Sequence, residues 1–124
     1  MEALIIKPTK TSLDIDLDPV SGILSFSGRA RPENSAAFFN PIIAWMLEYS
    51  KNAANRTEVN FKLEYFNSAA RKSMAEVFNI LEEIALSGKA VIIKWNYDET
   101  DEGMRETGEE YRDLFKIKFE FIPY

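Results

Sequence analysis

The chain contains neither cysteine nor histidine among its 124 residues. Without cysteine it has no disulfide, no thiol nucleophile and no cysteine-based zinc site, which fits a reducing compartment. Without histidine it has no Ser-His-Asp triad, no imidazole general base and no ordinary catalytic zinc centre. An enzyme built from this sequence would have to use carboxylates, lysine, tyrosine or serine alone.

Long apolar runs and an excess of positive charge are also missing. The longest apolar stretch, residues 36–47, is interrupted by Asn40 and Pro41 and is too short to span a bilayer. The apolar stretch at the N-terminus is too short for a signal peptide. The net charge is −5, whereas a general nucleic-acid binder usually presents a basic face. We therefore expect a cytoplasmic protein without a membrane or nucleic-acid partner.

The residues that are present are sufficient for one globular domain. Hydrophobic residues make up 46% of the chain and aromatic residues 13%, so a single core can be filled without covalent staples. The length fits one domain covering residues 1–124, and no internal repeat or linker interrupts it.

Alternating apolar and polar residues predict the strands. Residues 11–28 resemble a hairpin around the turn at residues 18–22, and residues 3–6 can add a short edge strand. Residues 58–66 alternate next, followed by residues 90–97 and 116–121. The side chains expected on the inner faces are Leu13, Ile15, Leu17, Val59, Phe61, Leu63, Tyr65, Ile117, Phe119 and Phe121.

Helical spacing predicts three helices between these strands. The first begins at an N-cap on Asn34 or Ser35, runs to about Asn52 and contains Pro41, which should kink it or delay its regular part. The second follows residue 67 and ends at Gly88. The third is a polar helix within residues 104–115.

The first helix is apolar over an arc of roughly 200°, whereas a one-sided surface helix needs little more than about 100°. Deep burial under the N-terminal strands explains this width, and so does a docking or dimer face. A homodimer is therefore possible.

The order of elements predicts an α/β fold with a mixed sheet, in which an N-terminal hairpin is followed by αβαβαβ. Because the strands alternate instead of being continuously apolar, the helices should lie mainly on one face. If the middle strands are parallel, the loops Arg29–Ser35, Asn67–Lys72 and Asn96–Glu102 meet at one edge of the sheet. The opposite, solvated face should carry Lys62, Glu64, Lys94, Lys118 and Glu120.

Ser68 lies where a strand passes into the second helix. A hydroxyl there can cap the helix, which contributes about 1 kcal/mol. It can also carry a phosphate, since a helix N-terminus tolerates the added charge of about −1.5 to −2. Arg71 and Lys72 follow three and four residues later, within reach of such a phosphate. The residues themselves leave capping and switching open, and the two are compatible.

The other charged groups do not indicate a metal site or a phosphate-binding loop. The acidic loop at residues 98–102 could bind a cation, but it lacks EF-hand spacing and suits the start of a helix. Lys7, Lys10, Arg29 and Arg31 form no phosphate loop, because no glycine-rich cradle accompanies them. We expect no metal and no cofactor.

Three segments resemble a known family. They are "SGRARPENSAAFFNPIIAWMLEY", "LEYFNSAARKSMAEVFNILEE" and "GKAVIIKWNYDETDE", and they cover most of the chain in order. They are similar to the SiaC family of bacterial regulatory phosphoproteins. The resemblance implies a STAS-like fold, as in anti-sigma-factor antagonists, and a phosphorylation switch at Ser68. The family site is often threonine followed by another hydroxyl, whereas Ala69 and Ala70 follow Ser68 here.

The resemblance also implies partners. A dedicated Ser/Thr kinase would add the phosphate, a PP2C-type phosphatase would remove it, and the unphosphorylated form would bind and activate an effector such as a diguanylate cyclase. We therefore expect a non-catalytic interaction switch. Asn67 should shape the turn before Ser68, and the expected partner-binding residues around it are Pro32, Glu33, Asn34, Ser35, Trp95 and Tyr97.

Two alternatives belong to other classes. An enclosed apolar pocket at the loop edge would favour a small-ligand-binding module. A buried carboxylate with a strongly raised pKa would favour a small carboxylate-based enzyme.

Overall fold

Three strands come first, and helices and strands then alternate along the chain, as the hydrophobic pattern predicts. The computed structural model describes all 124 residues. Its strands are β1 (Leu4–Ile6), β2 (Asp14–Leu17), β3 (Ile23–Ala30), β4 (Arg56–Phe66), β5 (Ala90–Tyr97) and β6 (Lys118–Pro123). Its helices are α1 (Ser35–Lys51), α2 (Ser68–Leu86) and α3 (Glu102–Leu114).

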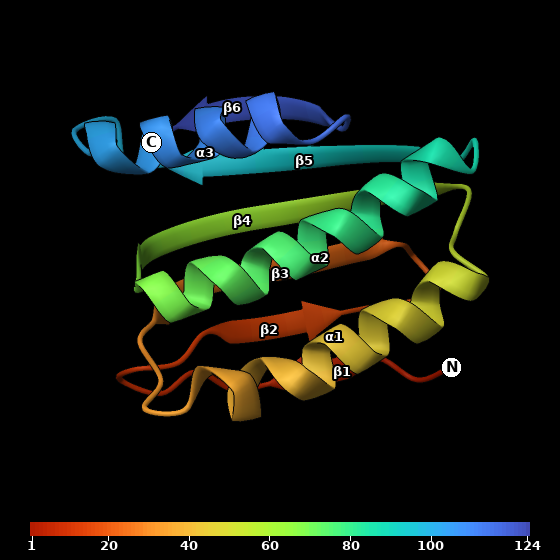
Figure 1. Cartoon of the computed structure of the whole chain (residues 1–124), viewed down its shortest axis with the longest axis horizontal. Coiled ribbons are helices and arrows are strands. Elements are labelled where there is room, and N and C mark those ends of the chain that lie inside the picture. Colours follow the sequence, from red (N-terminus) through yellow and green to blue (C-terminus); the bar gives the residue numbers. More distant parts are fainter.

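The six strands form one sheet in sequential order, β1-β2-β3-β4-β5-β6. The first two pairs are antiparallel, and the pairs β3–β4, β4–β5 and β5–β6 are parallel. Each parallel pair is joined by a helix, as Figure 1 shows. This arrangement confirms the predicted hairpin followed by αβαβαβ, and it is compatible with a STAS-like fold.

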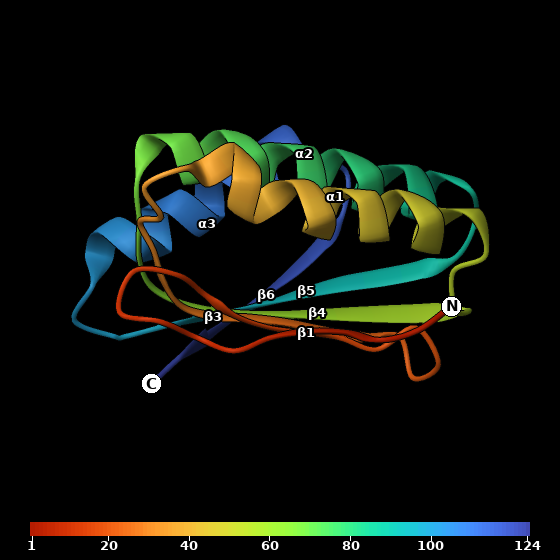
Figure 2. The same cartoon turned by 90° about the horizontal axis from the view of Figure 1, so that it is seen from below.

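All three helices lie on the same side of the sheet (Figure 2). The core fills the space between the layers, where the Phe61 ring lies 4.9 Å from Phe26, 5.2 Å from Phe78 and 5.5 Å from Trp95, measured between centroids. None of the helices is long and apolar enough to cross a membrane. The other face of the sheet carries the predicted polar side chains, of which Lys94 is half-buried and Lys62, Glu64, Lys118 and Glu120 are exposed.

The wide apolar arc of α1 is mostly covered. Phe39, Ile42, Met46 and Tyr49 are buried. Trp45 is half-buried, and its Nε1 donates a hydrogen bond to the Glu2 carbonyl at 2.8 Å. The arc is therefore explained largely by burial against the sheet and the N-terminal segment, the first of the two predicted explanations.

The prediction that Tyr65 faces inward is wrong. Gly28 pairs with Leu63, but the next residue, Arg29, pairs with Tyr65, so the register shifts by one residue at Glu64. Such a bulge reverses the side-chain alternation beyond it. Phe66 is consequently buried, whereas Tyr65 is 45% exposed.

Candidate functional site

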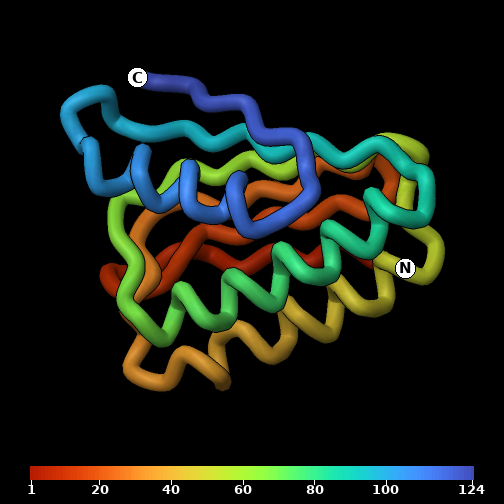
Figure 3. The backbone as a smooth tube through the Cα atoms, turned by 45° about the horizontal axis from the view of Figure 1, so that its top comes forward, coloured from red at the N-terminus to blue at the C-terminus, as the bar shows by residue number.

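The carboxyl ends of β3, β4 and β5 meet at one edge of the sheet, as predicted. Figure 3 shows the chain turning there from each strand into the next helix. The connection between β1 and β2, residues 7–13, lies at the same edge, because Arg31 N donates to Thr11 O at 2.8 Å. We call these four segments, residues 7–13, 29–35, 67–72 and 96–102, the carboxyl edge. The segment 7–13 was missed at the sequence level, although the antiparallel hairpin requires it to lie there.

Ser68 is the first residue of α2 and does not cap the helix. The cap is Asn67, whose Oδ1 accepts a hydrogen bond from Ala70 N at 2.9 Å. The Asn67 N–H donates to the Ala30 carbonyl at 3.0 Å, which fixes the turn to the end of β3. Ser68 is exposed, and its hydroxyl makes no hydrogen bond to the rest of the chain. The capping role expected of Ser68 therefore belongs to Asn67, and the serine hydroxyl is free to react.

Arg71 is already engaged by the body of the protein. Its Nη2 donates to Thr107 Oγ1 at 3.2 Å, and its guanidinium lies 5.0 Å from the centroid of the Phe66 ring. Its backbone carbonyl accepts a hydrogen bond from the Tyr111 hydroxyl at 3.2 Å. Burial raises the pKa of Tyr111 to about 12, so this hydroxyl remains a donor throughout the neutral range. Lys72 is exposed and makes no ion pair.

Residues 32–35, with the sequence PENS, lead into the start of α1. Asn34 is the N-cap, and its Oδ1 accepts from Ala37 N at 3.0 Å. Glu33 is exposed, whereas Pro32 and Ser35 are half-buried. The Ser35 Oγ atom is buried without a hydrogen-bond partner. The amide oxygen of Asn34 is thus used structurally, and Glu33 and Asn34 are the two residues of this segment that are exposed to solvent.

Trp95 requires a correction. It is fully buried on the core side of β5, and its Nε1 donates to the Met104 carbonyl at 3.0 Å. Gly108 of α3 packs so closely that a Cβ there would lie 2.5 Å from Trp95 Nε1. Trp95 therefore supports α3 and is not part of the surface that a partner can contact. Tyr97, at the end of β5, is half-buried, and its carbonyl accepts from Tyr124 N at 2.9 Å.

The acidic loop is organised by its own backbone. Asp98 Oδ1 accepts from the Thr100 hydroxyl at 2.7 Å and from the Thr100 N–H at 2.9 Å, and these two bonds lower the Asp98 pKa. Asp101 caps α3 by accepting from Met104 N at 3.0 Å. Both carboxylates thus serve a turn and a helix start, which is the interpretation that the sequence favoured over a cation site.

Tyr65 is a surface feature that the alternation pattern concealed. The bulge turns its ring outward, where the Arg31 guanidinium lies 5.7 Å from the ring centroid. Gly28, with φ +98°, stands opposite the bulge and was the available signal, since a glycine inside a strand often marks one. Glu64, within the bulge, lines three adjoining hollows of about 400, 200 and 390 Å³.

These hollows do not favour the two alternative functions. The largest has no hydrophobic lining, and all three are open to solvent, unlike the enclosed apolar pocket of a ligand-binding module. Asp18, Glu58 and Asp98 are the carboxyl groups with shifted pKa values, and all three shifts are downward. A carboxylate acid catalyst near neutral pH would need the opposite direction.

Comparison with known proteins agrees with this architecture over the whole chain. The model of the SiaC family regulatory phosphoproteins matches residues 6–124. An uncharacterized protein of Pseudomonas aeruginosa (strain UCBPP-PA14) is 32% identical over 119 residues, which are 96% of this chain and 94% of that protein.

Solved structures agree as well. Apo-SiaC from Pseudomonas aeruginosa has a TM-score of 0.92 at 30% identity, covering 98% of this chain and 99% of its own. SiaC in the crystal structure of the diguanylate cyclase SiaD in complex with its activator SiaC, from the same organism, gives the same values. With its fold and nearly its full length matched, the chain belongs to the SiaC family of regulatory phosphoproteins.

Proposed function

We propose that this protein is a regulator that binds and activates a diguanylate cyclase. The observation that carries the proposal is the similarity along the whole chain to a SiaC described as the activator of the cyclase SiaD, with which it was crystallised. In this proposal the protein acts by binding its partner, and the partner supplies the catalytic groups.

In this proposal the unphosphorylated form binds the cyclase. A dedicated Ser/Thr kinase phosphorylates Ser68, and a PP2C-type phosphatase reverses the modification. The support from geometry is that the Ser68 hydroxyl is exposed and free, while Asn67 holds the helix start without it. A phosphate can therefore be added without removing a cap, and the positive end of the helix dipole favours it by about 0.3–1 kcal/mol.

The phosphate changes the surface in two ways. It adds about −1.5 to −2 charges where the partner would bind. It also competes with Thr107 for Arg71, because Arg71 lies three residues further along α2. A hundredfold loss of affinity requires only about 2.8 kcal/mol, which one misplaced dianion at an interface can supply.

The proposed partner surface surrounds Ser68. It comprises the segment Pro32–Ser35, which includes the exposed Glu33 and Asn34, together with the side chain of Lys72 and the outward ring of Tyr65. Tyr97 lies at its rim. Tyr65 is the large aromatic side chain that this surface presents, and buried tyrosines often dominate binding energy at interfaces.

The decisive experiment uses the intact protein in two forms, unmodified and phosphorylated on Ser68, with the phosphate verified by a mass increase of about 80 Da. Binding to the cognate cyclase and stimulation of its activity are measured for both forms and for Ser68→Ala. We expect binding and activation by the unmodified protein and by Ser68→Ala, and at least about a hundredfold weaker binding by the phosphorylated form.

Ser73→Ala is the matched control, because Ser73 is the next hydroxyl along α2. This variant should still be phosphorylated and still respond. Equal binding by the phosphorylated and unmodified forms would refute the switch while leaving activation intact. Binding by neither form would refute the cyclase partner itself.

A further inference from the structure

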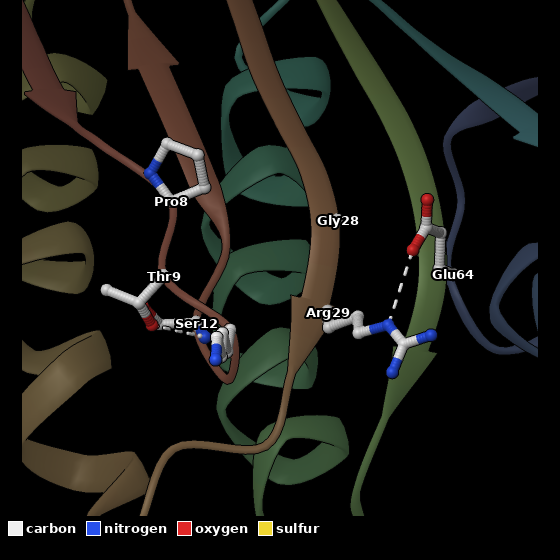
Figure 4. Close-up of a pocket in the computed structure, with 7 residues that line it drawn as sticks. Pro8, Thr9, Ser12, Gly28, Arg29 and Glu64 are labelled. Carbon is white, nitrogen blue, oxygen red and sulfur yellow. Dashed lines mark hydrogen bonds and ion pairs between the residues drawn. The ribbon is translucent and has the colours of Figure 1, made fainter.

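A hollow of about 400 Å³ opens on the strand face of the carboxyl edge, away from the helices (Figure 4). It lies between residues 8–12 on one side and the ends of β3 and β4 on the other. None of its seven lining residues is hydrophobic. Figure 4 shows Thr9 and Ser12 on one wall, and Arg29 extending toward Glu64 on the other.

The hydrogen bond between the Thr9 and Ser12 hydroxyl groups can be assigned a donor and an acceptor. Thr9 Oγ1 accepts hydrogen bonds from Thr11 N at 3.2 Å and from Ser12 N at 3.0 Å, which occupy both of its lone pairs. Thr9 must therefore donate its own hydrogen to Ser12 Oγ, 2.7 Å away. The Ser12 hydroxyl hydrogen is then left without an acceptor in the chain. It is a free donor at the wall of the hollow.

Positive charge gathers around this donor in a chain whose net charge is −5. Lys10 lines the hollow and makes no ion pair. Arg29 uses its Nε for Glu64 Oε2 at 3.4 Å, which leaves its Nη groups available. Lys7 directly precedes the hollow in sequence, and Arg31 is tied to it through Thr11. The groups available to a ligand are thus donors and cations, apart from the paired Glu64.

The hollow is also held in shape before any ligand arrives. Thr9 N donates to Ser12 O at 3.2 Å, and Arg31 N donates to Thr11 O at 2.8 Å. Gly28 contributes a wall without a side chain, since no atom lies within 4 Å of the place where its Cβ would be. A ligand can therefore approach the backbone of β3 without displacing anything.

We propose that this hollow binds a phosphate-class dianion. Ser12 donates to it through its hydroxyl, and Lys10 and Arg29 neutralise its charge. Because no hydrophobic residue lines the hollow, a phosphoryl group is recognised by itself, without an apolar side-chain pocket for a nucleobase. This site is distinct from Ser68, and the proposal does not depend on the phosphorylation switch.

The test is an NMR titration of the full chain labelled with ¹⁵N, using sodium phosphate at a constant ionic strength set by sodium chloride. We expect saturating shifts at Lys10, Ser12, Gly28 and Arg29. A second arm with ATP identifies the source of the phosphoryl group. Equal affinities for ATP and phosphate would support recognition of the phosphoryl group by itself, and tighter binding of ATP with additional shifts outside the hollow would contradict it.

Some variants are expected to weaken phosphate binding and another to strengthen it, so together they test the proposed roles of the individual side chains. Lys10→Gln and Ser12→Ala should each weaken binding about three- to tenfold, because each removes a donor to a charged ligand. Glu64→Gln should tighten it about threefold, because it removes a negative charge and releases Arg29. Lys51→Gln makes the same charge change as Lys10→Gln on α1 and should have no effect. Equal shifts with chloride alone, equal weakening by Lys51→Gln, or weakening by Glu64→Gln would overturn the proposal.

Discussion

The two ends of the parallel strands β3, β4 and β5 differ in the kind of side-chain interactions found there. At the amino edge, where β3, β4 and β5 begin, buried groups bind one another: the Tyr49 hydroxyl and Thr57 Oγ1 lie 2.8 Å apart, and Ala54 N donates to the Tyr49 hydroxyl at 3.3 Å. At the carboxyl edge, side-chain caps on Asn34, Asn67 and Asp101 start the helices. Serine, tyrosine and cationic side chains are left exposed beside them.

This difference indicates that the residues that stabilise the fold and the residues available for signalling lie at opposite ends of the strands. The amino edge contributes buried hydrogen bonds and tight backbone contacts, whereas the carboxyl edge offers reactive and charged groups on a scaffold that other residues hold. A phosphate or a partner can therefore act at the carboxyl edge without unfolding the chain. The four predictions below test this division, from the largest expected effect to the smallest.

The largest effect is expected from Gly22→Ala at the amino edge. Gly22 has φ +73°, and a Cβ there would lie 2.4 Å from the Arg56 carbonyl oxygen. Strain and overlap together should lower the free energy of unfolding by about 3 kcal/mol or more. Gly88→Ala is the control, because φ is +100° but the surrounding space is open, so about 1–2 kcal/mol is expected. Urea denaturation measures both, and equal losses would contradict the proposed close contact.

Tyr65→Ala should have the opposite profile. Tyr65 is 45% exposed, so the free energy of unfolding should fall by only about 1 kcal/mol, in part through loss of the Arg31 contact. Binding to the cyclase should weaken by at least about tenfold, as expected for an aromatic anchor. Leu47→Ala, on the outer side of α1 and 49% exposed, should leave binding unchanged. Similar affinities for the two variants would remove Tyr65 from the partner surface.

A smaller effect should distinguish Arg71 from Lys72 in the phosphorylated protein. A cation close to a phosphate favours its dianion and lowers its second pKa, which is ordinarily about 6. Arg71→Gln should therefore raise the pKa of the Ser68 phosphate by a few tenths of a unit in a ³¹P NMR titration. Lys72→Gln measures the other candidate in the same way. If neither variant shifts the pKa, the phosphate is read without these two residues, and Arg71 remains bound to Thr107.

The smallest effect is expected at Glu58 on the strand face. The hydrogen bond from Lys94, at 3.1 Å, is the main cause that lowers the pKa of Glu58, and Asn60 adds to it. A carboxyl with a lowered folded pKa stabilises the fold above its unfolded pKa, and this contribution disappears as the pH falls through the folded value.

Glu58→Gln should therefore lower the free energy of unfolding by less than about 1 kcal/mol at about pH 7, and by progressively less as the pH falls below the ordinary glutamate pKa of about 4.3. Urea titrations above and below that pKa measure this difference. A deficit that persists at low pH would show that Glu58 acts through packing and not through its charge.

Much of the fold could be predicted because it follows from local periodicity. Leu13, Ile15 and Leu17 alternate with aspartates, and all three are buried as expected. Ser68 was located at a helix start from sequence, but whether it or Asn67 forms the cap depends on backbone angles that composition does not fix. Trp95 was assigned to the surface because it is close to a loop in sequence. Its burial depends on Gly108, which approaches it from another element.

The bulge in β4 shows why the remaining site residues could not be found. Period-two alternation assigned Tyr65 to the core, and a single extra residue at Glu64 exchanged it with Phe66. The hollow with Lys10 and Ser12 was equally hidden, because its walls come from segments far apart in sequence. Gly28, inside the strand that faces the bulge, is the one local signal for the position of Tyr65, whereas Lys10 and Ser12 are brought to the hollow by tertiary pairing alone.

The sequential strand order also has a consequence for how the molecule is made. Each strand of β2 to β6 pairs with the strand synthesised immediately before it, so no strand must wait for a later one to be inserted beside it. The domain can therefore fold as a unit without opening a pair of strands that has already formed. Ser68 emerges before Thr107, the residue that later engages Arg71. The site of modification therefore has its full set of neighbours only when α3 is in place.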